Sequence, residues 1–310
     1  MAVTIMQLQY FCAVCRYGSI SKAAEALYVS HPTISVAIKS LEKEFSLELY
    51  AHTGNRVFLT EDGKAFYRKA VEILQRCDDM YASFAGRPED SYRVHVGIPP
   101  IRSTVIFPDL LREFHDRYPI PVVLHEYSSR RSMEKLENHE LDCCMVNFGA
   151  DSLARFHYRV LLQDRFVFCV SKENPLSQKE QVTAKDLDGV PLILQSDDSV
   201  LNEPLLQAFY KVNARPNPIL YSSQLETILN FIREGSSGAF LYGTIADSLR
   251  KISAGQGEEV LAVLPFRPVI KEEFVLFWQK GGYMNRNVKT WISFVKNYFS
   301  KNKEKELALN

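Results

Sequence analysis

The sequence predicts an α/β protein in which a small, mainly helical N-terminal domain precedes a larger domain built of two α/β lobes. Two patterns support this prediction. Apolar residues recur at helical spacing through most of residues 1–84, whereas short β-branched runs alternate with amphipathic helices from residue 93 onward. The length of 310 residues also fits two or three domains, at about 150 residues per domain.

Composition and charge exclude several classes of protein. The chain is 46% hydrophobic and 24% charged, and its net charge is zero. Its apolar runs are shorter than the roughly 20 residues that a membrane span requires. The N-terminal stretch MAVTIMQLQYF lacks the basic and apolar regions of an export signal. We therefore expect a cytoplasmic protein without a membrane partner, in which the scattered cysteines are reduced thiols.

Sequence motifs of catalysis and cofactor binding are absent. No P-loop, Gly-x-Ser-x-Gly elbow, GxGxxG fingerprint or metal-ligand spacing of histidines occurs. The pair Cys12-x-x-Cys15 has redox or zinc spacing, but both residues fall on an apolar helix face and no second pair follows. Cys143 and Cys144 are adjacent in an expected buried strand, which gives a thiol sensor little support. We expect no enzyme activity, no cofactor and no metal.

The stretch Ser19–Phe45, SISKAAEALYVSHPTISVAIKSLEKEF, predicts two short helices joined by a tight turn. Gly18 ends a preceding helix and Ser19 caps the next one. Ser30 caps the third helix, with Pro32 in its first turn. One narrow apolar stripe runs along this third helix, formed by Ile34, Ile38, Leu41 and Phe45. The opposite face is polar and partly basic, as in a helix-turn-helix that enters the DNA major groove. A plain three-helix bundle is the alternative.

The next segment, LELYAHTGNRVFLTEDG, predicts two short strands around a Thr-Gly-Asn turn, which favours a winged helix-turn-helix. Polar residues at the wing tip can reach phosphates or the minor groove. The predicted DNA-binding residues are Ser19, Ser21, Lys22, His31, Pro32, Thr33, Ser35, Val36, Lys39, His52, Asn55 and Arg56. Val36 either contacts a thymine methyl or lies on a solvated helix face. Residues 1–60 hold five basic and four acidic side chains, so we expect few phosphate contacts per subunit and an affinity that depends on oligomerisation.

These motifs resemble the N-terminal winged helix-turn-helix of LysR-type transcriptional regulators. The match runs in order through AAEALYVSHPTISVAIKSLEKEF and the Gly-x-x-Val-x-Leu-Thr-x-x-Gly wing. The sequence departs from the family where His31 replaces Gln, Val36 replaces Arg, and Leu49–His52 replaces Leu-Phe-x-Arg. The resemblance implies an oligomer, usually a tetramer, that binds double-stranded DNA at a dyad operator, responds to a small-molecule effector and contacts RNA polymerase.

A long helix after the wing is the predicted dimer element. Thr60 caps it, and Glu61 and Asp62 in its first turn complement the helix dipole. An apolar seam with the spacing 4, 3, 4, 3, 4 is formed by Phe66, Ala70, Ile73, Cys77, Met80 and Phe84. We expect this seam to pair two subunits, with burial against its own domain as the alternative. The following AGRPEDSY predicts the helix end and a hinge.

From residue 93, strands alternating with helices predict βαβ units around parallel sheets. The strand EEFVLFWQK and a helix over Val288–Phe299 return to the first lobe, with crossings near Leu161–Asp164 and Leu264–Arg267. Two lobes crossed twice are the architecture of periplasmic-binding-protein-like folds, and the resemblance to LysR-type regulators implies the same effector domain here. The predicted boundaries are 1–60 for the DNA-binding domain, 61–86 for the linker helix, 87–92 for the hinge, 93–300 for the effector-binding domain (lobe I 93–162 and 267–300, lobe II 163–266) and 301–310 for a charged tail.

Ligands of open α/β sheets bind beyond the carboxyl ends of the strands, often at helix N-termini. The predicted effector-binding residues at such places are Ile101, Arg102, Ser103, Thr104, Ser128, Ser129, Asn147, Phe148, Gln195, Ser196, Asp197, Gln224, Tyr242 and Thr244. Hydroxyls and backbone N–H groups at two helix starts favour an anion, most simply a carboxylate, to which Arg102 adds charge. Asp197 and Asp198 favour an amino group instead, and each residue taken alone fits an ordinary N-cap.

Two other functions stay open at this point. A solute-binding protein fits the two-lobed part, although the helix-turn-helix and the missing export signal argue against it. A repressor that is active without any small ligand fits the whole sequence.

Overall fold

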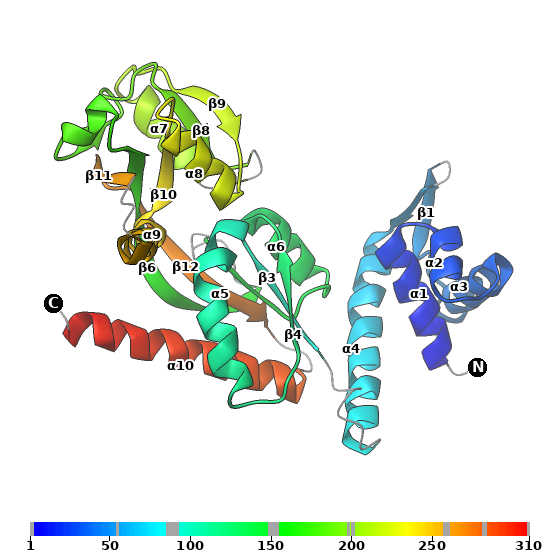
Figure 1. Cartoon of the computed structure of the whole chain (residues 1–310). Coiled ribbons are helices and arrows are strands. Elements are labelled where there is room, and N and C mark those ends of the chain that lie inside the picture. The colour runs from blue at the N-terminus through cyan, green and yellow to red at the C-terminus, as the bar shows by residue number, and fades with distance from the viewer. Residues whose placement is uncertain are drawn as a thin grey trace. The chain divides into compact units, whose positions relative to one another are not determined.

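A computed structural model describes residues 3–53, 56–84, 93–147, 155–196, 199, 202–256, 261–280 and 284–308 (Figure 1). The chain divides into two compact units, with the division between Tyr92 and Arg93. The predicted hinge, wing-tip Asn55, Phe148, Asp197 and Asp198 lie outside the described residues. No helix in the described part of the chain is long and apolar enough to cross a membrane.

The first unit is a winged helix-turn-helix followed by a long helix. Its elements are α1 (Ile5–Tyr17), α2 (Ile20–Ala26), α3 (His31–Phe45), the antiparallel strands β1 (Tyr50–Thr53) and β2 (Arg56–Leu59), and α4 (Glu61–Phe84). Gly18 takes a left-handed φ of 62° after α1, which glycine adopts without strain. The Ser19 and Ser30 hydroxyls accept hydrogen bonds from the first-turn amides of α2 and α3, so both predicted N-caps are confirmed.

An aromatic cluster holds the first unit together. The Phe11 ring of α1 packs on Tyr50, Phe66 and Tyr67, which brings β1 and α4 onto the helix pair. The Tyr50 hydroxyl donates to the Phe11 carbonyl at 3.0 Å, which satisfies its polar end inside the core. In α3 the predicted stripe is buried at Ile34, Ile38 and Leu41, whereas its last member, Phe45, stays 46% exposed and touches Phe66.

The second unit contains two α/β lobes. The first lobe holds β3 (Val94–Ile98), α5 (Pro100–His115), β4 (Val122–Glu126), α6 (Ser129–Glu137), β5 (Cys143–Asn147), β12 (Lys271–Gln279) and α10 (Arg286–Ala308). In this lobe α5 lies beside α10 (Figure 1). Phe107 and Phe114 of α5 pack on Trp291 of α10. The second lobe holds the short 3-10 helix η3 (Pro175–Gln178), β7 (Val182–Thr183), β8 (Pro191–Leu194), α7 (Asn202–Tyr210), β9 (Asn217–Tyr221), α8 (Leu225–Arg233), β10 (Gly238–Tyr242), α9 (Gly243–Gln256) and β11 (Leu261–Arg267).

One long strand, β6 (Phe156–Ser171), runs through both lobes and joins their sheets in the order β4-β3-β5-β12-β6-β10-β8-β9. It pairs with β12 up to Arg165 and with β10 from Phe166, so the lobes meet one residue after the first predicted crossing. The return crossing lies at residues 268–270, later than the predicted Leu264–Arg267, because β11 stays paired with β6 and β7 and buries Leu264 and Phe266 in the second lobe.

Three other elements differ from the sequence prediction. The sequence predicts a helix over Thr104–Tyr118, whereas α5 already begins at Pro100, because a proline is tolerated in the first helical turn. Helix α10 continues to Ala308 through the predicted tail, since the segment after Phe299 contains neither Gly nor Pro and is rich in Lys, Glu and Leu. Helix α9, which follows directly on β10, is not among the elements that the sequence predicts.

Candidate functional site

The outward face of α3 is the candidate DNA-binding surface of the first unit. His31, Pro32, Thr33, Val36 and Lys39 are exposed on it, and Val36 is exposed to 67%. The buried Ile34, Ile38 and Leu41 fix this orientation, because they lie on the opposite face of the same helix.

The start of α3 and the preceding turn are held by local hydrogen bonds. The Ser30 and Thr33 hydroxyls lie 2.8 Å apart, and the Thr33 amide donates to Ser30 at 3.3 Å. In α2, Ser21 and Lys22 are exposed, and the Lys22 amide donates to the Ser19 cap. Tyr28, in the turn, is 96% exposed and has a left-handed φ of 54°. Of the predicted wing residues, His52 on β1 is paired with Val57, and Arg56 on β2 is paired with Thr53.

The predicted dimer seam along α4 divides into two parts. Phe66 and Ala70 pack into the core of their own unit, as the alternative interpretation of the seam requires. Further along, Ile73 and Met80 are exposed to 43% and 54%, and Cys77 is half-buried. An apolar cavity of about 410 Å³ lies where the seam passes from its buried to its exposed part. It is lined by Val3, Leu8, Phe45, Leu47, Asp62, Ala65, Phe66, Lys69, Ala70 and Ile73.

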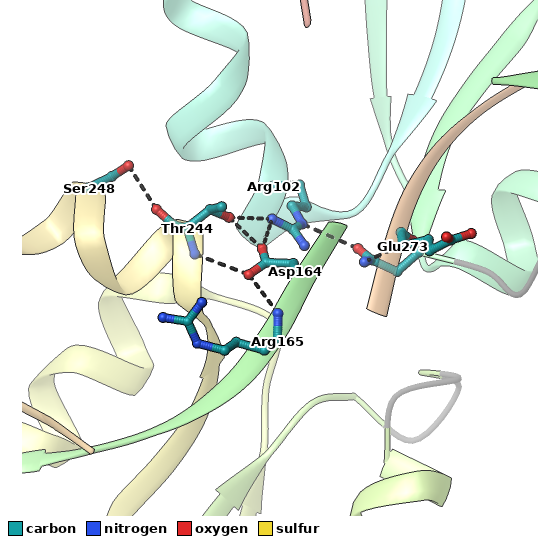
Figure 2. Close-up of polar contacts among 7 residues, drawn as sticks. Arg102, Asp164, Arg165, Thr244, Ser248 and Glu273 are labelled. Carbon is teal, nitrogen blue, oxygen red and sulfur yellow. Dashed lines mark hydrogen bonds and ion pairs between the residues drawn. The ribbon is translucent and has the colours of Figure 1, made fainter. Parts of the chain in front are cut away.

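In the second unit, Arg102 lies at the centre of a polar cluster between the lobes (Figure 2). Its side chain is fully buried at the start of α5. Nη1 donates to Asp164 Oδ2 and to Thr244 Oγ1, both at 2.8 Å, and Nε donates to Asn147 Oδ1 at 3.2 Å. The guanidinium also stacks 3.6 Å above the Tyr242 ring. The structure therefore brings together four predicted effector-binding residues, Arg102, Asn147, Tyr242 and Thr244. Arg102 contacts each of the other three side chains in place of a ligand.

Asp164 is the member of this cluster that sequence reasoning missed. It lies on β6 one residue before the strand changes lobes, and its side chain is 2% exposed. Besides Arg102, three donors reach its carboxylate: the Arg165 amide, the Thr244 amide and the Thr244 hydroxyl, the last at 2.5 Å. The Thr244 amide belongs to the first turn of α9, whose dipole favours a negative charge there. The only feature of the sequence that could have identified Asp164 is its position at the predicted crossing between the lobes.

The other predicted effector-binding residues do not converge on the Arg102 cluster. Ile101 is buried in the apolar core of the second lobe. The Ser103 hydroxyl donates to the Pro100 carbonyl and to Glu126, and the Thr104 hydroxyl donates to the Pro100 carbonyl. Ser128 caps α6, and Ser129 is buried beside it.

In the second lobe, a separate group of hydroxyl and amide side chains lies at the ends of β8 and β9. The Ser196 hydroxyl lies 2.8 Å from that of Ser223, and Asn202 donates to the carbonyls of Gln195 and Ser196. Gln224 is exposed and accepts from Thr227. Ser223 and Asn202 are not among the residues that the sequence predicts for this site.

Burial keeps most of the cysteines as neutral thiols. It raises the thiol pKa of Cys12, Cys15 and Cys169 to about 12, and the pKa values of Cys143 and Cys144 are raised further by the same cause. Oxidation by peroxide proceeds through the thiolate, so these five groups are poor redox sensors at neutral pH. Among the described residues, no group of three or more His, Cys, Asp or Glu side chains is placed to hold a metal.

A winged helix-turn-helix attached to a two-lobed α/β domain defines a transcriptional regulator that carries its own sensory domain. The sequence matches the family "LysR substrate binding domain" over residues 87–300 and "Bacterial regulatory helix-turn-helix protein, lysR family" over residues 5–64. The chain therefore belongs to the LysR family of DNA-binding transcriptional regulators.

Relatives and solved structures of the family match along nearly the whole chain. The uncharacterized HTH-type regulator YwbI of Bacillus subtilis is 29% identical over 297 residues, covering 95% of this chain and 96% of the relative. A hydrogen peroxide-inducible genes activator of Dickeya chrysanthemi is 23% identical over 98% of both chains. Full-length OxyR from Pseudomonas aeruginosa has a TM-score of 0.68 at 21% identity, covering 96% of this chain and 95% of that one. Full-length CbnR in complex with its target DNA has a TM-score of 0.57 at 19% identity, over 95% and 99% of the two chains.

Proposed function

We propose that a dimer of this chain binds a dyad operator through α3 and the wing, and that a small metabolite bound between the lobes controls transcription. The observation that carries the DNA-binding part is the exposed outer face of α3, from His31 to Lys39, above a fully buried inner face. The role is regulatory and not enzymatic.

The proposed DNA contacts are the exposed residues of α2 and α3 together with His52, Asn55 and Arg56 of the wing. Val36 presents an apolar surface where it can contact a thymine methyl. The near balance of charge over residues 1–60 favours few phosphate contacts per subunit. Two half-sites bound at once then supply the affinity that one domain lacks.

The seam of α4 is exposed at Ile73 and Met80 and half-buried at Cys77, which supports its use as the dimer contact, with Phe84 as its predicted end. Apolar side chains exposed along one helix stripe are stabilised by pairing with a second helix. Assembly into a tetramer and contact with RNA polymerase are further parts of the proposal, which rest on the family to which the chain belongs.

The proposed effector is a small metabolite with a carboxylate group. Because Asp164 already neutralises Arg102, we assign the anion to the hydroxyls of Ser128, Ser129 and Ser196 and to the amides at the start of α6, with Gln195 and Gln224 as further contacts. Peroxide sensing, which the names of several relatives describe, is not part of the proposal, because a raised pKa keeps five of the six thiols of the chain protonated.

A repressor active without ligand is the second candidate. It is favoured by one observation: the Arg102 cluster joins the lobes through the chain's own side chains.

The test is capture of genomic DNA fragments by the purified protein at about 0.15 M salt, where non-specific binding is weak. We expect enrichment of a few intergenic fragments that contain a dyad. The variant Lys39→Glu on the outer face of α3 is expected to lose the enrichment, and Lys211→Glu, an exposed change in the second lobe, is expected to keep it. Equal enrichment by both variants contradicts the proposed DNA surface.

The effector is tested separately by thermal unfolding with a panel of small carboxylates. A ligand at 100 times its Kd stabilises the protein by about 2.7 kcal/mol. A shift with one carboxylate, lost in Ser196→Ala, supports the site. No shift with any acid, in a protein that still selects its operator, favours the ligand-free repressor.

A further inference from the structure

Two acidic side chains face each other where the lobes join. In the antiparallel pair of β6 and β12, Asp164 and Glu272 are direct cross-strand partners, so both side chains project from the same face of the sheet. The neighbouring pairs, Glu273 with Gln163 and Lys271 with Arg165, project from the opposite face. Like charges in directly opposite positions repel, so the two carboxyl groups need a shared cation or a proton.

Arg102 is the shared cation, and it is engaged unequally. Its Nη1 pairs with Asp164 at 2.8 Å, whereas Nη2 is buried without a hydrogen-bond partner in the described part of the chain (Figure 2). Asp164 receives four hydrogen bonds, which fixes the negative charge on that residue. The described residues provide no hydrogen bond to the Glu272 carboxyl.

The surroundings of Glu272 therefore favour its neutral form. Burial raises the pKa of Glu272 from 4.5 to about 7. Arg102 on α5 opposes this rise, and Asp164 on β6 and Glu273 on β12 add to it. Tyr242 on β10 also faces Glu272, and its phenol is itself kept protonated by burial. The neighbouring elements α5, β6 and β10, and β12 itself, thus each contribute a charged or titratable group.

The acidic pair lies where the lobes join, so protonation of Glu272 affects the contacts that hold the lobes together. Arg102, Asp164 and Glu272 belong to the first lobe, and Tyr242 and Thr244 belong to the second. Glu272 follows the return crossing at residues 268–270 by two residues. When Glu272 loses its proton, two carboxylates compete for one guanidinium, and the Arg102 contacts that reach across to Thr244 are weakened.

We propose that Glu272 carries a proton that holds the two lobes together, and that loss of this proton loosens the joint. The effector domain then responds to pH independently of any metabolite or operator. The contacts between the lobes are most stable in acid and least stable once Glu272 is fully ionised.

The first test is direct titration of the full-length protein labelled with ¹³C at glutamate carboxyl carbons. We expect one glutamate signal with a midpoint near pH 7 that is missing in Glu272→Gln and present in Glu273→Gln, the matched control on the opposite face of the same strand. If no glutamate titrates above pH 6, or if the signal persists in Glu272→Gln, the proposal is wrong.

The second test measures the joint itself by hydrogen exchange of peptides that cover Leu161–Phe166, corrected for the intrinsic effect of pH. If opening solvates Glu272, the opening equilibrium rises by up to about tenfold per pH unit from pH 5 to pH 7 and then levels off. Glu272→Gln is expected to remove this pH dependence while Glu273→Gln retains it. The same dependence in all three proteins would show that the proton acts elsewhere.

Discussion

Replacement of Asp164 by alanine gives the sharpest test of how the second unit is held together. The change leaves the fully buried Arg102 guanidinium without its counter-ion and removes the acceptor of the Thr244 hydroxyl and amide. Breaking a buried ion pair from one side costs about 3–5 kcal/mol, because the remaining charge stays desolvated. We expect a loss of that size in the free energy of unfolding of the second unit. Removing both charges in Arg102→Met/Asp164→Ala is expected to cost less than the sum of the two single changes.

The measurement is urea unfolding followed by tryptophan fluorescence. Both tryptophans of the chain, Trp278 and Trp291, lie in the second unit, so the signal reports that unit alone. Asp109→Ala is the control, because its ion pair with Arg112 is exposed and such pairs contribute at most about 1 kcal/mol. A loss below about 1 kcal/mol for Asp164→Ala, or strict additivity in the double variant, would refute the reasoning that Arg102 depends on this counter-ion.

Three further predictions concern single residues. The pKa of Glu272 is raised in the folded state, so the stability that its protonated form contributes is complete below pH 4.5 and is lost as pH rises to about 7. We therefore expect urea unfolding curves to give Glu272→Gln a free energy of unfolding about 3 kcal/mol above that of the wild type at pH 8, and an equal one near pH 4. Tyr28→Gly relieves a left-handed φ of 54° at a side chain with almost no contacts, and we expect thermal unfolding to show a gain of about 0.5–1 kcal/mol; a loss would mean that the exposed ring stabilises the turn. Gly63→Ala places a Cβ 2.1 Å from the Leu49 carbonyl oxygen, so the wing and α4 must separate; we expect a loss of at least about 2 kcal/mol by circular dichroism despite the better helix propensity of alanine, and no loss would contradict the close approach.

The sequence was sufficient to predict the local structure of the first unit because the signals there are local. Ser19 and Ser30 cap helices within three residues, and Gly18 stops α1 where only a left-handed residue fits. The α4 seam was harder, because helical spacing shows which residues share a face and not what covers that face. Phe66 and Ala70 face the unit's own core while Ile73 and Met80 do not, and this division depends on where the wing ends.

The sequence predicted which residues lie near the joint between the lobes, but not which contacts they make there. Strand ends and helix starts placed Arg102, Asn147 and Thr244 on one edge, which the structure brings together. Whether a buried arginine binds a ligand or another side chain depends on a residue far along the chain that shares its burial, here Asp164 at a separation of 62 residues. The pairing register of β6 and β12 determines the rest of the cluster, because a shift of one residue between these strands would turn Glu272 away from Asp164. The chemistry of the joint thus depends on strand pairing, which a single sequence does not specify.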